Sequence, residues 1–345
     1  MSLFPGRTRD TVPAVEEIVP ANRVIWLNGE LVPWAQATVH VLSHSLQRGS
    51  LVFDYMAVHE TPRGSAIFRL DRHVQRMLRS CELMGLPIAL DEAELSSAIV
   101  QAVRANPGGS SVKASAYFAS LEVDVVPVDT RVSVAIAVYD PKTDLGERLQ
   151  QARPQARPQA LPQALPRAER RPLRLWLEKQ AHQRRDDIVS PHAKVSANYA
   201  SSMTAKARAQ KLGFDEILLV DENDHVAEGP TTNVFVVDRD GVLLTPPETR
   251  VLRGVTRESI IELARIGGTE VREQSIEPAE LMAASEVFLT GTTAGVLAVE
   301  SVDGESIGSA CPGPLSQKLA EILSQVESGN DSRFDHWLTY VGKED

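Results

Sequence analysis

A run of regularly spaced prolines divides this chain of 345 residues. Residues 151–166 are four tetrapeptides, Gln-Ala-Arg-Pro twice and Gln-Ala-Leu-Pro twice, so that every fourth residue is proline. Because proline lacks a backbone N–H and restricts φ, neither a helix nor an interior strand can run through this segment. We predict an extended, polyproline-like linker here, with a folded half on either side.

The chain is long enough for two hydrophobic cores. We predict a flexible N-terminal arm at residues 1–20 and a small α+β domain at 21–140. A proline-rich interdomain linker that includes the repeat is expected at 141–172, and a large α+β domain at 173–345.

Charge and cysteine content argue against several classes of function. The formal net charge is −10, and Lys and Arg do not cluster with aromatic residues, so we expect no nucleic-acid partner. Cys81 and Cys311 are far apart and lack zinc-ligand spacing, so we expect neither disulfides nor a metal site. No apolar run of about 18 residues could span a membrane, and residues 1–20 lack the apolar core of a signal peptide. We predict a cytoplasmic protein.

The first half carries signals for strands and amphipathic helices. Asn28-Gly29 between two apolar stretches is typical of a type I′ hairpin turn. Helical spacing of apolar residues begins at Leu70, and Asp91 with Glu94 resembles a capping box for a second helix. The expected strands are 24–27, 30–32, 50–59, 65–69, 112–118 and 132–139. The last of these is almost wholly apolar, which predicts a central position in the sheet.

The second half alternates strands with helices. We expect strands at 173–177, 216–220, 234–237 and 287–290, and helices after residue 195 and at 256–265. Asp240-Gly241 indicates a hairpin turn. Since both halves mix sheet and helix, the sequence predicts an α+β protein of two unlike domains, with a site in the crevice between them.

Lys194 is the candidate chemical centre. Its neighbours Ala193, Val195, Ser196 and Ala197 are small or apolar, which leaves room for a bulky planar group and suits a lysine that forms a Schiff base. The alternative is a lysine at the start of a helix that reaches back to solvent. These residues alone leave both interpretations open.

A carboxylate and a helix start accompany this lysine. Glu228 stands where a strand ends at a bend, and its carboxylate could bond a protonated pyridine nitrogen, although a loop glutamate is the ordinary alternative. Gly254 precedes a helix whose first free amides, those of Val255 and Thr256, form a potential anion site. The alternative is a simple helix start capped by Thr256.

An arginine and a turn complete the candidate set. Arg69 ends a predicted strand and could bind a phosphate, or could form a surface salt bridge. The sequence Thr-Gly-Thr-Thr-Ala-Gly at 290–295 is a small, hydroxyl-rich turn whose amides could bind a phosphate or a carboxylate.

Several segments together resemble the class IV, fold-type IV pyridoxal-phosphate aminotransferases, and most closely the branched-chain amino acid aminotransferases. They are Ile-Trp-Leu-Asn-Gly-Glu, Val-His-Val-Leu-Ser-His-Ser-Leu, Phe-Arg-Leu-Asp-Arg-His-Val-Gln-Arg-Met, Lys-Val-Ser-Ala-Asn-Tyr-Ala-Ser-Ser, Glu-Gly-Pro-Thr-Thr-Asn-Val-Phe, Leu-Thr-Pro-Pro and Gly-Val-Thr-Arg-Glu-Ser-Ile-Ile. The resemblance runs from about residue 24 to the C-terminus, apart from the repeat. It implies a two-domain α+β fold like that of D-amino-acid aminotransferase, pyridoxal 5′-phosphate as cofactor, a large domain that binds the cofactor, and a homodimer.

The resemblance also implies roles for individual residues. Lys194 is the catalytic Schiff-base lysine and proton shuttle, Glu228 the partner of the pyridine nitrogen, and Tyr199 a donor to the ring oxygen. Leu252 packs on the cofactor ring. The implied cofactor-binding residues are Arg69, Lys194, Tyr199, Glu228, Leu252, Val255, Thr256 and Thr292. The implied substrate-binding residues are Arg48, Tyr55, Val112, Ala114, Thr292 and Thr293.

One departure affects the substrate site. The bacterial branched-chain enzymes have Tyr-x-Arg where a gap-free alignment places Val112-Lys113-Ala114 here, so a hydroxyl and a guanidinium are lost. Strand alternation then predicts that Lys113 points to the other face. The segments at 48–50 and 54–55 also differ from the family's Tyr-Gly-Thr and Glu-Gly. Arg48 and the amides at 291–293 are the donors available to replace the lost hydroxyl and guanidinium. We expect weak activity on branched-chain L-amino acids, and better relative activity on donors that lack an α-carboxylate or present it differently.

The reaction that these features favour is transamination. The first substrate hypothesis is a branched-chain or other apolar L-amino acid with a 2-oxo acid such as 2-oxoglutarate. The alternatives within the fold are a D-amino-acid or (R)-amine transaminase and aminodeoxychorismate lyase. A catalytically silent relative that binds the cofactor or a partner is the non-enzyme alternative.

Overall fold

The computed structural model describes residues 22–146, 171–179, 185 and 187–342. The predictions for the arm at 1–20 and for the repeat at 151–166 lie outside the described residues. The described residues form two compact units. The N-terminal unit comprises 22–146, 193–197 and 327–342, and the C-terminal unit comprises the remaining described residues. This division differs from the single domain expected at 173–345, because residues 193–197 and 327–342 both pack with the N-terminal unit.

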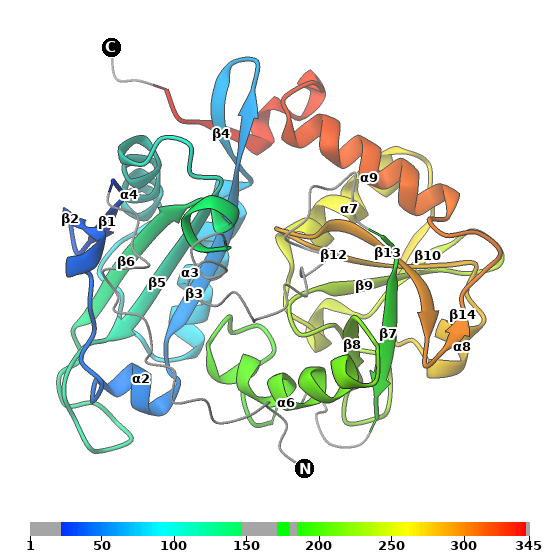
Figure 1. Cartoon of the computed structure of the whole chain (residues 1–345), viewed down its shortest axis with the longest axis horizontal. Helices are drawn as coiled ribbons and strands as arrows, with labels where there is room; N and C mark the ends of the chain where they lie inside the picture. Colours follow the sequence, from blue (N-terminus) through cyan, green and yellow to red (C-terminus); the bar gives the residue numbers. More distant parts are fainter. Residues whose placement is uncertain (1–21, 147–170, 180–184, 186, 343–345) are drawn as a thin grey trace. The chain divides into compact units, whose positions relative to one another are not determined.

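The N-terminal unit contains a seven-stranded antiparallel sheet in the order β15-β4-β3-β5-β6-β1-β2 (Figure 1). Its strands are β1 (Val24–Leu27), β2 (Glu30–Pro33), β3 (Val52–Thr61), β4 (Gly64–Phe68), β5 (Ser111–Phe118), β6 (Val132–Tyr139) and β15 (Leu338–Tyr340). The type I′ turn is confirmed, since Asn28 and Gly29 have φ of 51° and 101°. The interior position predicted for the strand 132–139 is also confirmed, because β6 lies between β5 and β1.

Helices α3 (Leu70–Leu83) and α4 (Glu92–Ala105) cover one face of this sheet, with α3 against β3 and α4 against β1, β5 and β6. The predicted capping box at Asp91 and Glu94 is present and begins α4. Burial alternates along β3 from residue 52 to 59, where the even-numbered residues are buried and the odd-numbered residues are partly open. The sheet therefore has one packed face and one accessible face. The short helix α2 (His44–Arg48) precedes β3.

The C-terminal unit contains a second, mixed sheet in the order β11-β10-β9-β12-β13-β7-β8, with β14 paired to β13 (Figure 1). Its strands are β7 (Leu173–Glu178), β8 (Glu216–Leu219), β9 (Asn233–Val237), β10 (Leu243–Thr245), β11 (Val271–Glu273), β12 (Glu286–Gly291), β13 (Gly295–Val302) and β14 (Glu305–Ser306). Its helices are α6 (Ala197–Lys211), α7 (Val255–Ile266), α8 (Pro278–Met282) and α9 (Pro314–Glu327). The strands and helices predicted for this half are confirmed, whereas β10, β11, β13, β14, α8 and α9 were not predicted.

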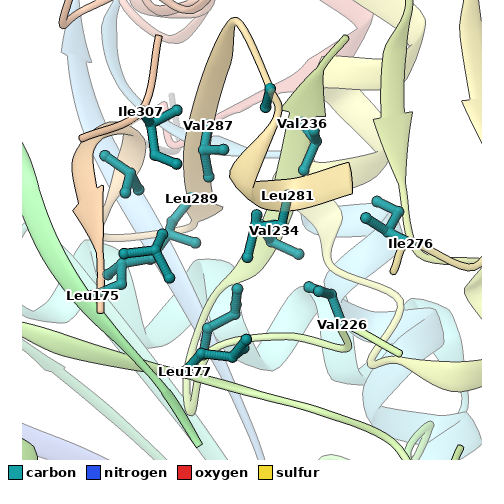
Figure 2. Close-up of a cluster of buried hydrophobic side chains, with 14 of the residues drawn as sticks. Leu175, Leu177, Val226, Val234, Val236, Ile276, Leu281, Val287, Leu289 and Ile307 are labelled. Atoms are coloured by element: carbon teal, nitrogen blue, oxygen red, sulfur yellow. The ribbon is translucent and has the colours of Figure 1, made fainter. Parts of the chain in front are cut away.

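A cluster of aliphatic side chains forms the main core of the C-terminal unit (Figure 2). Leu175 and Leu177 of β7, Val234 and Val236 of β9, and Leu289 of β12 belong to it. All five residues of β9 are buried, and the four that follow Asn233 are apolar, as a strand covered on both faces requires. None of the helices in the described part of the chain combines the length and the apolar character needed to cross a bilayer.

Candidate functional site

Lys194 is held by its backbone in the N-terminal unit. Its carbonyl accepts a hydrogen bond from the Phe53 N–H at 3.0 Å, and its own N–H donates to Ser80 Oγ of α3 at 3.0 Å. Next to it, Val195 forms an antiparallel bridge with Val52, and the Ser196 N–H donates to the Leu51 carbonyl at 2.9 Å. The lysine thus lies on a short extended segment paired with the start of β3, so the position of its Cα is fixed.

The Lys194 amine lies at the accessible face of the sheet. Its Nζ is 5.0 Å from the centre of the Phe53 ring, and Lys113 Nζ is 4.9 Å from the same ring centre. Burial lowers the pKa of Lys113, and the positive charge of Lys194 lowers it further. Lys113 does lie on the face opposite to Val112 and Ala114, as strand alternation predicts, but this is the face that holds the Lys194 amine. The expectation that Val112 and Ala114 line the substrate pocket, with Lys113 turned away from it, is therefore wrong.

The strand register explains this correction. In the pairing of β3 with β5, Tyr55 is opposite Lys113, Asp54 is opposite Ala114, and Met56 is opposite Val112. Opposed residues share a face. Val112 and Ala114, which we expected to bind substrate, are completely buried on the packed face. The gap-free alignment with the family's Tyr-x-Arg was therefore wrong by one residue. A shift of one residue along a strand moves every side chain to the opposite face of the sheet.

Tyr55, another expected substrate residue, does lie on the accessible face. Its hydroxyl donates to Ser111 Oγ at 2.6 Å, and burial raises its pKa. Because Tyr55 and Lys113 are a cross-strand pair, a phenol and an ammonium group stand side by side near Phe53.

Arg69 stands between β4 and α3 in the left-handed conformation, with φ of 50°. A non-glycine residue is strained there and persists only where its surroundings hold it. Its N–H donates to the Trp337 carbonyl at 2.6 Å, and its guanidinium carbon lies 4.4 Å from the centre of the Trp337 ring. Trp337 therefore supports Arg69, a role that nothing in the local sequence around either residue indicates.

A buried charge network anchors α3 to β3. Asp54 is fully buried and accepts hydrogen bonds from His73 Nδ1 at 2.7 Å and from Arg76 Nε and an Arg76 terminal nitrogen, both at 2.8 Å. Burial by itself would raise the pKa of Asp54, but the charges and hydrogen bonds of Arg76 and His73 lower it far below the usual range. Burial lowers the pKa of His73, and the neighbouring Asp54 carboxylate opposes this effect. Since α3 also carries Ser80, this network helps to position Lys194.

Glu228 is almost completely buried in the C-terminal unit. Its carboxylate accepts hydrogen bonds from Asn233 Nδ2 at 3.2 Å and from the Leu252 N–H at 3.3 Å. Asn233 Nδ2 also donates to the Leu252 carbonyl at 3.0 Å. Two neutral donors, the Asn233 amide and the Leu252 N–H, thus orient the carboxylate.

The start of α7 is linked to the Glu228 carboxylate through Asn233. The Asn233 amide bonds both this carboxylate and the carbonyl of Leu252, which lies two residues before Gly254. Gly254 is the N-cap, and no side chain caps the first turn. A Cβ at Gly254 would collide with Asn233 Oδ1, so only glycine fits. Thr256 in the first turn is buried. Uncapped amides at the positive end of a helix of 12 residues suit a phosphate.

The remaining predicted site residues lie on three other elements. Tyr199 is partly buried on α6, and Thr292 and Thr293 form the turn between β12 and β13. Arg48 ends α2, where it is exposed and donates to the Val123 carbonyl. Arg48 therefore holds the loop that contains Val123.

The residues present fit pyridoxal 5′-phosphate. The N-terminal unit contains a positioned amine, which suits the cofactor's aldehyde. The C-terminal unit contains a buried carboxylate and a helix start that excludes a Cβ, which suit the ring nitrogen and the phosphate. Lys194, Glu228 and Gly254 with the amides of Val255 and Thr256 provide these features.

Comparisons with known proteins bear on the same chemistry. The family model described as Amino-transferase class IV matches residues 51–302. Branched-chain-amino-acid aminotransferases of Pseudomonas aeruginosa and Escherichia coli K12 are 33% and 32% identical to this chain, and each alignment covers 92% of this chain and 97% of the relative.

Solved structures are similar over nearly the whole chain. The T.th. branched-chain amino acid aminotransferase complexed with N-(5′-phosphopyridoxyl)-L-glutamate has a TM-score of 0.81 and 32% identity, and covers 94% of this chain and 100% of that chain. The branched-chain aminotransferase of Thermoproteus uzoniensis with norvaline has a TM-score of 0.81 and 30% identity, and covers 93% of this chain and 99% of that chain.

Family model, relatives and solved structures agree with the α+β fold, the enzyme class and the cofactor expected from the sequence. The amine, the carboxylate and the anion site are those that such an enzyme requires. The chain belongs to the class IV aminotransferases of fold type IV, and it is a pyridoxal-phosphate-dependent transaminase.

Proposed function

We propose that this transaminase exchanges amino groups between an apolar L-amino acid, with branched-chain donors first, and a 2-oxo acid such as 2-oxoglutarate. The names of the relatives support this choice, as do the solved neighbours with an L-glutamate adduct and with norvaline. The observation that carries it is the Lys194 amine at a sheet face that also presents Lys113 and Tyr55. With Lys113 on that face, the ground for expecting weak activity on branched-chain donors disappears.

The residue roles are part of this proposal. When bound, pyridoxal phosphate supplies an electron sink that stabilises negative charge at the substrate α-carbon. Lys194 bonds the cofactor and then carries a proton at Nζ to and from the reacting carbons. Glu228, oriented by Asn233 and the Leu252 N–H, binds the protonated ring nitrogen. Tyr199 donates to the ring oxygen.

Other residues are proposed to bind the phosphate and to contact the face of the cofactor ring. Arg69, held in place by Trp337, supplies a permanent positive charge for the phosphate. The amides of Val255 and Thr256 supply N–H donors at the start of α7, and Thr292 adds a hydroxyl. Leu252 packs on the ring.

The test is a half-reaction with single donors. The purified holoenzyme is mixed with L-leucine, L-isoleucine, L-glutamate, D-leucine or (R)-1-phenylethylamine, and conversion of the cofactor is followed by its absorbance. We expect fast conversion by the three L-amino acids and regeneration by 2-oxoglutarate. Conversion by D-leucine or by the amine alone would instead assign a D-amino-acid or (R)-amine transaminase. Pyruvate release from aminodeoxychorismate without amino transfer would assign the lyase.

We also propose that the enzyme is a homodimer. The loop 119–131 exposes Leu121, Val123, Val125, Val126 and Val128, and Val123 and Val128 are each 90% exposed. The neighbouring segment 39–46 exposes Val39, Val41, Leu42 and Leu46. The two segments are joined, since the His44 N–H donates to the Ser120 carbonyl at 2.9 Å and His44 Nε2 lies 2.9 Å from the Val125 carbonyl. We call these nine side chains the valine-rich patch.

An apolar patch of this kind on a soluble domain favours coverage by protein. A second copy of the chain is the proposed occupant, and light scattering after gel filtration measures it. The double change Val123→Asp with Val126→Asp should give monomers. Leu212→Asp, at an exposed leucine outside the patch, is the matched control. A wild-type monomer at micromolar concentration would contradict the proposal.

A cytoplasmic location completes the proposal. Cys81 and Cys311 are free thiols, as a reducing compartment allows. The formal net charge of −10 argues against a nucleic-acid partner.

A further inference from the structure

The segment 327–342 belongs to the N-terminal unit, whereas residues 314–326 immediately before it belong to the C-terminal unit. Its strand β15 is an edge of the N-terminal sheet and pairs antiparallel with β4, so that Leu338 is opposite Phe68. Arg69 follows β4 directly. This pairing therefore brings the segment 327–342 to the residue that is proposed to bind the cofactor phosphate.

Two contacts from Trp337 fix the conformation of Arg69. The Trp337 carbonyl accepts a hydrogen bond from the Arg69 N–H at 2.6 Å, which helps to hold the Arg69 backbone in its left-handed conformation. The centre of the Trp337 ring lies 4.4 Å from the guanidinium carbon, within range of a cation–π interaction. Both residues are only 3% exposed, and such an interaction is stronger when it is desolvated than at a surface.

Neighbouring aromatic rings hold the Trp337 ring in turn. Its centre lies 4.7 Å from the centre of the Phe334 ring and 5.8 Å from that of the Phe68 ring. Phe334 and Phe68 are both buried, and a ring packed in this way cannot turn without moving its neighbours. The guanidinium of Arg69 therefore lies against a fixed surface. A side chain that is already ordered loses less conformational freedom when a ligand binds, which favours affinity.

A second arginine at the other end of β4 provides a comparison. Arg63 precedes β4, and its guanidinium carbon lies 3.9 Å from the centre of the Tyr340 ring on β15. The Arg63 side chain is 57% exposed and forms an ion pair with Asp335 at 2.7 Å. This exposed pair suits a structural contact. The Trp337 ring, by contrast, orients the buried guanidinium of Arg69 without adding a negative charge that would repel a phosphate.

We propose that Trp337 is a positioning residue for the cofactor phosphate. Through it, the segment 327–342 determines how strongly the enzyme prefers pyridoxal 5′-phosphate to pyridoxal, the same molecule without the phosphate. This inference rests on the proposed role of Arg69 in binding the phosphate. It goes beyond that role because it assigns cofactor retention to the pairing of β15 with β4, and not to the residues around Arg69 alone.

The first experiment measures cofactor binding without turnover. The full-length chain, freed of cofactor, is titrated separately with pyridoxal 5′-phosphate and with pyridoxal. Trp337→Leu should weaken the Kd of pyridoxal 5′-phosphate by about 10- to 30-fold, the range that a buried cation–π interaction implies, and should leave the Kd of pyridoxal unchanged. Trp337→Phe keeps an aromatic face and should lie between the wild type and Trp337→Leu.

Tyr340→Leu is the matched control, because it removes an aromatic ring and a cation–π contact from the same strand but does not touch Arg69. It should change neither Kd. The melting temperature of each variant shows which ones fold, and Trp337→Phe decides the outcome by itself if Trp337→Leu is unfolded. Equal weakening of both ligands by the Trp337 variants would give Trp337 a purely structural role and overturn the proposal. An unchanged Kd of pyridoxal 5′-phosphate would overturn it too.

The second experiment separates this inference from the proposed role of Arg69. Arg69→Met should weaken the binding of pyridoxal 5′-phosphate and not that of pyridoxal. Adding Trp337→Leu to Arg69→Met should cause no further loss, because Trp337 acts through Arg69. If Arg69→Met removes the preference for the phosphate but Trp337→Leu does not, only this inference is refuted. A preference that survives Arg69→Met would refute the proposed role of Arg69, and this inference with it.

Discussion

Replacing Asp54 by asparagine tests the charge network that anchors α3 to the sheet. The carboxylate is fully buried and accepts three hydrogen bonds from His73 and Arg76, at 2.7 to 2.8 Å. Asparagine is nearly isosteric but carries no charge, and its amide nitrogen would face donors of Arg76 or His73. The guanidinium of Arg76 would then lose the Asp54 charge in a largely buried position.

Removing one partner of a buried ion pair costs about 3–5 kcal/mol, far more than an exposed pair, since the remaining charge stays desolvated. For a unit of this size, that loss corresponds to a decrease of roughly 10 °C in melting temperature. The contribution depends on pH with a definite sign. The pKa of Asp54 is lowered in the folded state, so its contribution is complete above the unfolded pKa of about 3.9 and is lost as pH falls below that value.

Thermal and urea unfolding of the wild type and Asp54→Asn between neutral and acidic pH measure this effect. The difference in stability should be largest at neutral pH and should shrink below about pH 4. Arg131→Gln is the matched control, because it removes the exposed ion pair with Asp129 and should leave the melting temperature unchanged. A loss below about 1 kcal/mol at neutral pH, or a difference that does not vary with pH, would refute the reasoning.

Four further predictions concern the site and the linker. Borohydride reduction of the holoenzyme followed by peptide mapping should label Lys194, and Lys194→Ala should abolish both label and turnover; label on another lysine would refute the assignment. Glu228→Gln keeps an acceptor but removes the charge, so we expect kcat to fall by about 100-fold or more, measured with L-leucine, and a normal kcat would exclude Glu228 as the ring-nitrogen partner. Gly254→Ala forces a Cβ against Asn233 and should weaken cofactor affinity in an equilibrium titration, whereas unchanged affinity would show that α7 does not bind the phosphate. Deletion of residues 151–166 should leave the melting temperature within a few degrees, because closure entropy grows slowly with loop length, and a large loss would mean that the segment is packed.

Local spacing was sufficient to predict most elements and the chemically distinctive residues. The Asn28-Gly29 turn, the capping box at Asp91 and the strand 132–139 all appear as expected, because turn type, cap and strand depend on side chains a few positions apart. Lys194 and Glu228 became candidates because each lies within a short, characteristic stretch of sequence, and the resemblance to the class IV aminotransferases then implied their roles.

Features that depend on pairing between distant segments became known only from the tertiary structure. The face on which Lys113 lies is decided by the register of β5 against β3, and a displacement of one residue reverses it. The support of Arg69 by Trp337 follows from the pairing of β15 with β4, which joins segments far apart in the sequence. Asp54, His73 and Arg76 likewise meet only because α3 packs on one face of β3. Sequence periodicity shows that a strand has two faces, but the choice between them depends on long-range packing, which no local pattern encodes.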